Sequence, residues 1–190
     1  NFYQPKLRVH SLVLSGVEVL VRWQHEKYGI VPPSKFIPLA ERFGFIDELT
    51  YKIFEIALDQ KREWNKKGAS FNLALNLSPL SLNESGIADN IIRLVEEFKI
   101  KPEEIILEVT ENAIADQISQ SIEVLARLRL HGFQISIDDF GTGYASIQQL
   151  SRVPATELKI DRSLVKNIAS KPQQQTILEN TLNMASDLNL

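Results

Sequence analysis

Strand-like apolar runs alternate with amphipathic helical patterns along this chain of 190 residues, and this alternation restricts the fold more than any other feature of the sequence. The runs predict strands at 17–23, 71–78, 105–110, 133–138 and 157–161, with a weaker first strand at 3–7. Apolar residues at helical spacing predict helices within 46–57, 87–98, 118–126 and 178–188. Strands separated by helices form parallel sheets, either as an open doubly wound sheet or as a closed barrel.

Three smaller expectations come from the helical patterns. A short extra helix is predicted over 33–41, where two prolines and a serine open the segment. The last apolar stripe consists of Leu178, Leu182, Ala185 and Leu188 and runs to the end of the chain. The basic pairs that begin at Lys61 and Lys66 are expected on the exposed face of their helix, in contact with water.

The faces of the predicted strands favour the barrel. Strands of an open sheet with helices on both sides are apolar on both faces, whereas here one face is apolar and the other is mixed. Because successive side chains point to opposite faces, Glu108 opposes Leu107, and Glu18 and Arg22 share one face of the strand at 17–23. An apolar outer face and a polar inner face are typical of a (β/α) barrel with a polar mouth.

Oxygen-bearing side chains collect on the inner faces of these strands. Four strands contribute Glu18, Asn76, Glu108 and Asp138, and Asp139 follows immediately. Oxygen ligands without cysteine or paired histidine suit the hard cations Mg²⁺ and Mn²⁺, and like charges this close repel one another unless cations neutralise them. The alternative is that each acid pairs with a nearby Lys or Arg, or is solvated at a strand end. Because few inward cations balance the acids, the metal interpretation is favoured.

Two inward cations, Arg22 and Lys159, accompany the acids. An arginine can bind a phosphate through two parallel hydrogen bonds. Lys159 is either a structural counter-ion or a residue that holds a water or a phosphate oxygen. A metal site with arginine and lysine indicates phosphate ester chemistry, and the residues alone do not name a substrate.

Composition excludes several other classes of protein. There is no cysteine for a disulfide, a thiolate metal site or a thiol nucleophile. A net charge of −3 and a pI near 5.7 argue against a DNA-coating protein, and no apolar run reaches the roughly 18 residues that span a membrane. Because the chain begins at Asn1 and is shorter than the roughly 250 residues of a TIM barrel, we expect a piece of a longer polypeptide, with one barrel incompletely covered at its C-terminal end.

Several motifs follow one another in the order of a known family. They are Glu18-Val19-Leu20-Val21-Arg22-Trp23, Phe36-Ile37-Pro38-Leu39-Ala40-Glu41, Asn76-Leu77-Ser78-Pro79, Leu107-Glu108-Val109-Thr110-Glu111, Asp138-Asp139-Phe140-Gly141-Thr142-Gly143-Tyr144 and Leu158-Lys159-Ile160-Asp161. The sequence resembles the EAL domain family, the cyclic di-GMP phosphodiesterases of bacterial signalling, with Val19 where the naming motif has Ala. The resemblance implies a single domain over 1–190, a TIM-like (β/α)8 barrel with an antiparallel first strand and about six of its eight strands.

The resemblance also implies a two-metal site that holds Mg²⁺ or Mn²⁺. Glu18, Asn76, Glu108 and Asp138 resemble ligands of one metal. Asp138 would bridge to a second metal, which Asp139 also binds. A bridged metal pair lowers the pKa of a shared water and offsets charge on the attacked phosphodiester.

Other residues acquire roles through the same resemblance. Lys159 would hold the attacking water, so that Lys159, Glu18, Asp138 and Asp139 are the candidate catalytic residues. Glu111 would anchor the loop after Asp139 and link metal occupancy to dimer packing, without binding metal itself. The substrate pocket would include Gln4, Leu20, Arg22 and Pro38, with Arg22 at a phosphate.

The activity implied is hydrolysis of cyclic di-GMP to linear pGpG at the C-terminal mouth of the barrel. It depends on a further catalytic glutamate that the family carries on a strand beyond Leu190. The alternatives are a module that binds cyclic di-GMP or a protein without turnover, and a barrel enzyme for another phosphate ester. Expected partners are a second copy of the chain and an upstream sensory or GGDEF-type domain, with no DNA. The expected location is the cytoplasm, including the cytoplasmic part of a membrane-anchored protein.

Overall fold

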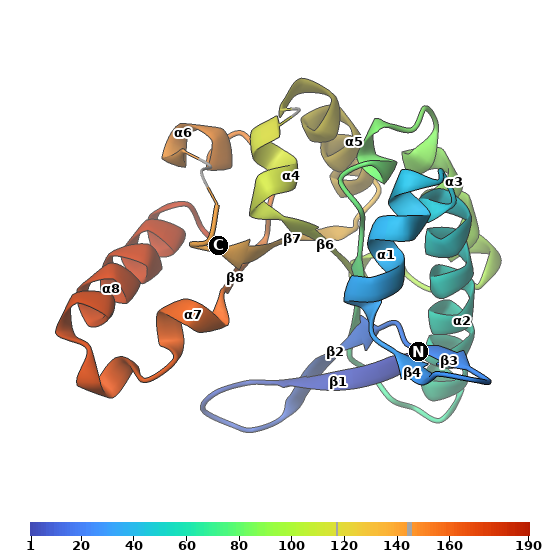
Figure 1. The fold of residues 1–190 in the computed structure, drawn as a ribbon, viewed down its shortest axis with the longest axis horizontal. Coiled ribbons are helices and arrows are strands. Elements are labelled where there is room, and N and C mark those ends of the chain that lie inside the picture. The colour runs from blue at the N-terminus through green and yellow to red at the C-terminus, as the bar shows by residue number, and fades with distance from the viewer. Residues whose placement is uncertain (117, 144–145) are drawn as a thin grey trace.

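Six strands form one curled sheet with helices on its outside (Figure 1). The computed structural model describes residues 1–116, 118–143 and 146–190, so Tyr144 of the predicted motif lies outside the described residues. In sheet order the strands are β1 (Phe2–Leu7), β2 (Leu14–Leu20), β5 (Asn72–Asn76), β6 (Ile105–Thr110), β7 (Gln134–Phe140) and β8 (Glu157–Ile160). β1 pairs antiparallel with β2, and the other neighbours pair in parallel. The predicted TIM-like barrel with an antiparallel first strand and six strands present is confirmed.

The helices and the remaining strands connect the sheet strands in the expected order. The longer helices are α1 (Pro33–Arg42), α2 (Ile46–Lys66), α3 (Ile87–Glu97), α5 (Ile118–Leu130) and α8 (Pro172–Asp187). The shorter ones are α4 (Glu111–Asp116), α6 (Ile147–Leu150), α7 (Arg162–Val165), and the 3₁₀ turns η1 (Ser81–Asn83), η2 (Pro102–Glu104) and η3 (Ile168–Ser170). A separate hairpin of β3 (Trp23–His25) and β4 (Gly29–Val31) precedes α1. No helix in the described part of the chain has the length and apolar character needed to cross a membrane.

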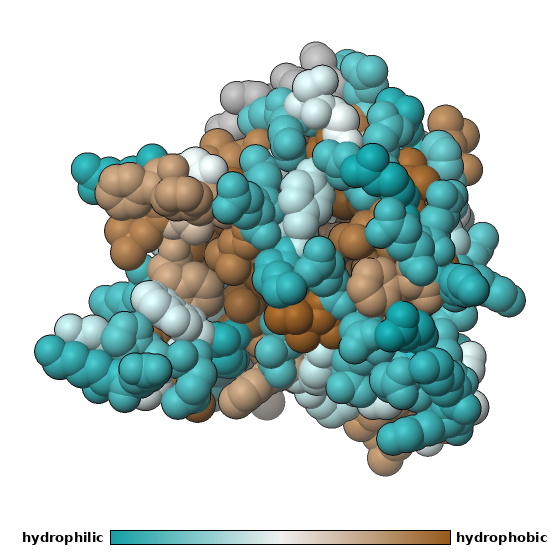
Figure 2. All heavy atoms as spheres, turned by 90° about the vertical axis from the view of Figure 1, so that its right-hand side faces the viewer, coloured by the Kyte–Doolittle hydropathy of each residue, from teal (hydrophilic) through white to brown (hydrophobic). Residues whose placement is uncertain are grey.

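The core lies between the outer face of the sheet and the helices. Alternate strand residues point outward and are fully buried, which is the pattern that the sequence predicts for a barrel. Burial of each such side chain stabilises the fold by about 1.5–3 kcal/mol. One continuous cluster includes Leu73, Leu75, Leu107, Val109, Ile135 and Ile137 of the strands and Phe54 and Leu58 of α2. The face in Figure 2 is mostly hydrophilic, with hydrophobic side chains gathered near its middle.

The strand predicted at 17–23 has the expected length but lies three residues earlier in the chain. β2 ends at Leu20, and the chain resumes strand structure only in the β3–β4 hairpin at Trp23. Arg22 therefore lies outside β2, and the prediction that it shares a strand face with Glu18 is wrong. Its guanidinium donates a hydrogen bond to the carbonyl of Val21 and lies over the ring of Phe2.

The prediction that Lys61 is solvated is wrong. The Lys61 side chain is fully buried, and its Nζ lies 2.6 Å from Glu104 Oε2 and 2.8 Å from Asn65 Oδ1. The ammonium also lies 4.9 Å from the centre of the Phe71 ring. Helical periodicity did not predict this burial, because the compensating carboxylate comes from η2, far along the chain.

The apolar stripe predicted in the last helix is not uniformly buried. Leu182 of α8 is 52% exposed, and Thr181 is the buried residue of this helix. α8 packs mainly against α7 and η3, the short helices that follow the edge strand β8 (Figure 1). A helix at the sheet edge has less apolar surface to cover than α2 or α3.

Candidate active site

Three carboxylates from three strands meet at the C-terminal mouth of the sheet. Glu18 of β2, Glu108 of β6 and Asp138 of β7 each place one carboxylate oxygen within 4.8 Å of the others. Lys159 of β8 points into this group, with Nζ 2.9 Å from Glu108 Oε2, 2.9 Å from Asp138 Oδ2 and 3.3 Å from Glu18 Oε2. Four residues that the sequence places on inner strand faces thus share one small volume.

Glu108 is the most buried of the three acids. Its side chain has no exposed surface, and Oε1 has no hydrogen-bond partner among the described residues. Burial raises the pKa of Glu108 to about 7; the charge of Glu18 adds to this rise and the charge of Lys159 opposes it. The environment of Glu108 therefore contains less positive charge than its ionised form requires.

Lys159 is the cation in direct contact with all three acids. Burial by itself would lower its pKa, but the charge of Glu108 and the hydrogen bonds to Glu108 and Asp138 raise the pKa well above the usual lysine value. Lys159 is therefore protonated at physiological pH. A protonated amine donates hydrogen bonds and cannot accept a proton.

A β-bulge presents the two consecutive aspartates at the mouth. In the β7–β8 register Ile137 pairs with Leu158 and Phe140 pairs with Ile160, so that Asp138 and Asp139 together oppose Lys159. Asp139 has a positive φ of 55°, and its N–H donates a 2.9 Å hydrogen bond to Asp138 Oδ1. Partial burial and the charge of Asp138 raise the pKa of Asp139. Simple strand alternation does not predict this bulge.

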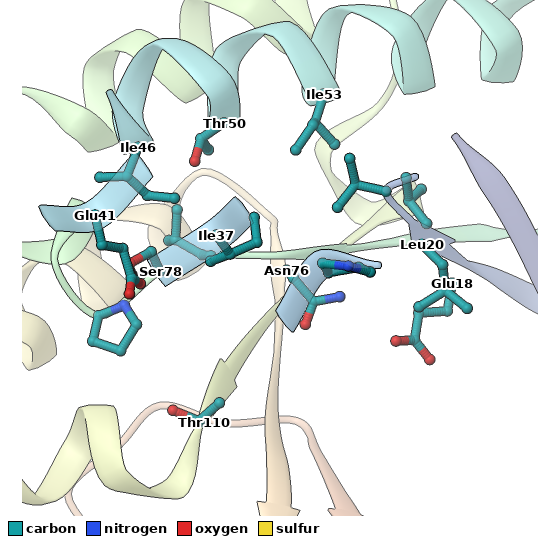
Figure 3. A pocket seen from close by; sticks show the side chains of 15 residues that line it. Glu18, Leu20, Ile37, Glu41, Ile46, Thr50, Ile53, Asn76, Ser78 and Thr110 are labelled. Carbon is teal, nitrogen blue, oxygen red and sulfur yellow. Dashed lines mark hydrogen bonds between the residues drawn. The ribbon is translucent and has the colours of Figure 1, made fainter. Parts of the chain in front are cut away.

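Asn76 and the substrate-side candidates lie on or next to the elements that carry the acidic group. Asn76 ends β5, pairs in register with Glu108 and lines a pocket together with Glu18 and Leu20 (Figure 3). Gln4 of β1 pairs in register with Glu18. Pro38 is exposed on α1, one turn before the end of that helix. Arg22 is engaged with backbone and an aromatic ring, as described above.

Glu111 joins the end of β6 to the loop after β7. Its buried carboxylate accepts hydrogen bonds from the backbone N–H groups of Gly141 at 2.9 Å and Gly143 at 3.1 Å. A Cβ atom at Gly143 would lie 2.9 Å from the Glu111 carboxyl carbon, so a side chain there would displace this carboxylate. Glu111 therefore contacts the loop and lies outside the group of three acids that could hold a metal ion.

Lys6 is an inner residue that the sequence analysis did not single out. Its Nζ lies 2.7 Å from Glu157 Oε1 and 3.7 Å from Glu108 Oε1, and Ser136 donates a 2.9 Å hydrogen bond to the same Glu157 oxygen. Strand alternation could have predicted the inward position of Lys6, because Lys6 is two residues after Gln4 in β1 and so shares its face.

The acidic group fits a hard divalent cation. Lys159 faces all three carboxylates and Lys6 lies 3.7 Å from Glu108 Oε1, an atom with no hydrogen-bond partner among the described residues. All the candidate donors are carboxylate or amide oxygens, the ligands that Mg²⁺ and Mn²⁺ prefer. The alternative of simple ion pairing accounts for Lys159 and leaves the excess negative charge unexplained.

Fold and site together define a (β/α)-barrel domain with an acidic, oxygen-rich mouth. The family model described as "EAL domain" matches residues 1–190. The chain belongs to the EAL domain family.

Named relatives of this chain are cyclic di-GMP phosphodiesterases. The cyclic di-GMP phosphodiesterase RocR of Pseudomonas aeruginosa is 33% identical over 189 residues, which cover 100% of this chain and 48% of RocR. The bifunctional diguanylate cyclase/cyclic di-GMP phosphodiesterase MucR of the same species is 38% identical over 99% of this chain and 28% of MucR. The chain thus spans about half or less of the length of these curated relatives.

Solved structures show the same fold. The phosphodiesterase MucR in complex with cyclic di-GMP superposes with a TM-score of 0.93 and 38% identity, over 99% of this chain and 76% of that chain. The FimX EAL domain of Pseudomonas aeruginosa, bound to cyclic di-GMP, superposes with a TM-score of 0.89 at 20% identity, over 98% of this chain and 75% of that chain. The second likeness is evidence for the fold alone.

Proposed function

We propose that this chain hydrolyses one phosphodiester bond of cyclic di-GMP and releases linear pGpG, as part of bacterial second-messenger signalling in the cytoplasm. The observation that carries the proposal is the convergence of Glu18, Glu108 and Asp138 on Lys159 in an EAL domain. The names of RocR and MucR support the substrate.

The acidic mouth would hold two Mg²⁺ or Mn²⁺ ions. Glu18, Asn76, Glu108 and Asp138 would bind one, and Asp138 and Asp139 the other. When bound, such a pair lowers the pKa of a water and offsets negative charge on a phosphodiester. The bulge supports this assignment because it presents Asp138 and Asp139 together opposite Lys159.

Lys159 would orient the attacking water. Because its ammonium is held by Glu108 and Asp138 and its pKa is raised, it donates hydrogen bonds to the water and does not remove a proton. Positioning of the attacking oxygen in line with the bond that breaks supplies a large part of the rate in such reactions.

The substrate would lie against the residues on the β1, β2 and α1 side of the mouth. Leu20 and Pro38 offer apolar surface to a guanine base, and Gln4 lies opposite Glu18 on the neighbouring strand. Arg22 would contact a phosphate oxygen through guanidinium N–H groups other than the one that donates to the Val21 carbonyl. Glu111 would hold the loop that follows Asp139 through its two backbone hydrogen bonds.

A homodimer and a neighbouring GGDEF-type domain complete the proposal. The name of MucR, a bifunctional diguanylate cyclase/phosphodiesterase, supports the second expectation. Sedimentation of the full-length protein with and without Mg²⁺ tests the dimer, and a Glu111→Ala variant tests whether the loop couples metal to association.

The activity test compares two glutamate variants. Full-length protein is incubated with cyclic di-GMP and Mg²⁺, and pGpG is quantified by chromatography. We expect turnover by the wild type and by Glu96→Ala, whose glutamate is exposed on α3, and a loss of at least about a hundredfold in Glu18→Ala. Equal turnover by all three would refute the metal assignment, and binding without hydrolysis by the wild type would favour the receptor alternative.

A further inference from the structure

A side-chain hydrogen bond joins α1 to the loop that follows β5. Ser78 Oγ donates to Glu41 Oε1 at 2.8 Å, and the N–H of Leu80 donates to the same hydroxyl oxygen at 3.2 Å. Figure 3 shows Glu41 and Ser78 facing each other at one end of the pocket. Within the described part of the chain no Lys or Arg pairs with Glu41, so a neutral hydroxyl is its partner.

Both ends of this hydrogen bond lie close in sequence to candidate site residues. Glu41 is three residues after Pro38 on α1, so the two share one face of the helix. Ser78 is two residues after Asn76, the last residue of β5. The bond therefore connects the segment assigned to substrate binding with the segment assigned to metal binding.

Packing alone holds α1 weakly. Phe36 is the single buried residue of this helix, all of whose residues are described. A pocket of about 380 Å³ is lined by Ile37 of α1 and by Ile46 and Ile53 of α2, so part of the face of α1 borders a cavity. A helix with so little buried apolar surface depends more strongly on a charge-assisted hydrogen bond than a well-packed helix does.

We propose that Glu41 is a positioning residue for substrate binding: through Ser78 it holds α1, and with it Pro38, in place over the mouth of the site. This inference rests on the proposed function for the identity of the substrate. Glu41 acts through the position of α1 and does not touch the reacting atoms.

The expected consequence is a change in KM. If the hydrogen bond is lost, α1 occupies its binding-competent position for a smaller fraction of the time, and the apparent dissociation constant rises by the inverse of that fraction. A contact that acts equally on bound substrate and transition state alters KM and leaves kcat unchanged. Loss of a hydrogen bond to a charged group corresponds to about a tenfold change.

Four variants test the proposal with cyclic di-GMP as the probe and Mn²⁺ as the metal. Glu41→Ala and Ser78→Ala are each expected to raise KM about tenfold with kcat within about twofold. The double variant is expected to be no worse than either single one, because both remove the same bond. Glu41→Gln keeps an acceptor oxygen and is expected to retain nearly the wild-type KM.

Two further measurements separate positioning from a general structural role. Hydrogen exchange over 33–42 is expected to accelerate in Glu41→Ala and Ser78→Ala and to remain protected in Glu41→Gln. Calorimetric Mn²⁺ affinity is expected to change by less than about twofold, because the acidic group is intact. Unchanged exchange, additive effects in the double variant, or a parallel loss of kcat and Mn²⁺ affinity would each overturn the proposal.

The outcome also distinguishes failure of this inference from failure of the proposed function. A wild-type protein that turns over cyclic di-GMP, with Glu41→Ala unaltered in KM, overturns the role of Glu41 alone. A wild-type protein that neither binds nor hydrolyses cyclic di-GMP overturns the proposed function, and the substrate role of Glu41 with it.

Discussion

Lys61 and Lys159 lie at opposite ends of the barrel, and the balance of charge around the two side chains differs. Lys61 is fully buried near the start of the strands and has one carboxylate, one amide oxygen and one aromatic ring as partners. Lys159 is 22% exposed at the ends of the strands and faces three carboxylates. The first environment matches one positive charge with one negative charge, and the second has an excess of negative charge.

This difference in charge balance leads us to expect different roles for the two lysines. In a hydrogen-bonded ion pair with equal and opposite charges, each partner neutralises the other, and no additional ion is required. A group of acids with too little positive charge is destabilised alone and is stabilised by a bound cation. In TIM barrels the C-terminal ends of the strands carry the active site and the N-terminal ends contribute stability, and we expect the two lysines to differ in the same way. Replacing each lysine by methionine, which keeps an apolar stem of similar length, tests it.

The largest expected effect is on activity at the Lys159 end. Lys159→Met removes the proposed hydrogen-bond donor to the attacking water, and we expect kcat for cyclic di-GMP to fall about a thousandfold, or about 4 kcal/mol. Turnover is measured by chromatography of pGpG with Mg²⁺ in excess. Lys61→Met, measured at the same concentration of folded protein, is expected to keep its kcat. If the two variants lose activity equally, the proposed division of roles is wrong.

The next effect is on stability at the Lys61 end. Lys61→Met leaves Glu104 without its cation beside a buried segment, and we expect the free energy of unfolding in urea to fall by about 3 kcal/mol, at the lower end for a broken buried pair because Glu104 is 28% exposed. Lys66→Met is the matched control, since Lys66 pairs with Glu63 on the exposed side of the same helix, and it should change stability by less than about 0.5 kcal/mol. Equal effects of the two variants would contradict the structural role of Lys61.

Adding and removing metal tests whether the acidic group around Lys159, and not the pair at Lys61, binds a cation. A ligand that binds the folded state alone stabilises it by about 2.7 kcal/mol at a hundred times its dissociation constant. We expect Mn²⁺ to raise the Tm of the wild type and chelation by EDTA to lower it again. Glu108→Gln is expected to abolish the Mn²⁺ effect, and Glu104→Gln, at the other lysine, to retain it. A Tm of Glu108→Gln that still responds fully to Mn²⁺ would count against the carboxylate site.

The sequence predicts the acidic group better than it predicts the buried pair, for a physical reason. Glu18, Glu108, Asp138 and Lys159 each stand in a short strand, and the period of two decides which face each occupies. The barrel then brings all inner faces together, so local patterns suffice. Lys61 depends on Glu104 of η2, a contact that helical periodicity does not contain.

Local backbone irregularities account for the other differences between expectation and structure. β2 ends at Leu20 and not at Trp23, so Arg22 does not continue the strand face of Glu18. The bulge at Asp138 and Asp139 interrupts the alternation at two residues proposed to bind metal. The pairing of β2 with β1 ends where Phe2 meets Leu20. The bulge combines a register shift against β8 with positive φ at Asp139, and a single-strand pattern encodes neither feature.

The smallest expected effect is a pH dependence of stability at the Lys61 end. Partial burial tends to raise the pKa of Glu104, but the hydrogen bonds from Lys61 and Asn65 and the charge of Lys61 outweigh it, and the pKa is lowered. The folded state therefore binds fewer protons than the unfolded state just below the ordinary glutamate pKa. Its contribution is complete above that pKa and is lost as the pH falls through the lowered value. Because Glu104 is partly exposed, we expect a contribution of at most about 1 kcal/mol.

Glu104→Gln isolates this contribution, because it removes the titrating group and keeps an amide of the same shape. Urea unfolding of the wild type and of Glu104→Gln from neutral pH down to about pH 3 should give a stability difference that shrinks as Glu104 becomes protonated. Glu63→Gln, at the exposed Lys66 pair, is the control and should show a smaller difference throughout. A difference between wild type and Glu104→Gln that stays constant with pH would mean that the ionised carboxylate contributes nothing to holding Lys61. The charge balance that separates the two ends of the barrel would then lie in hydrogen bonding and packing around Lys61, and not in its ion pair.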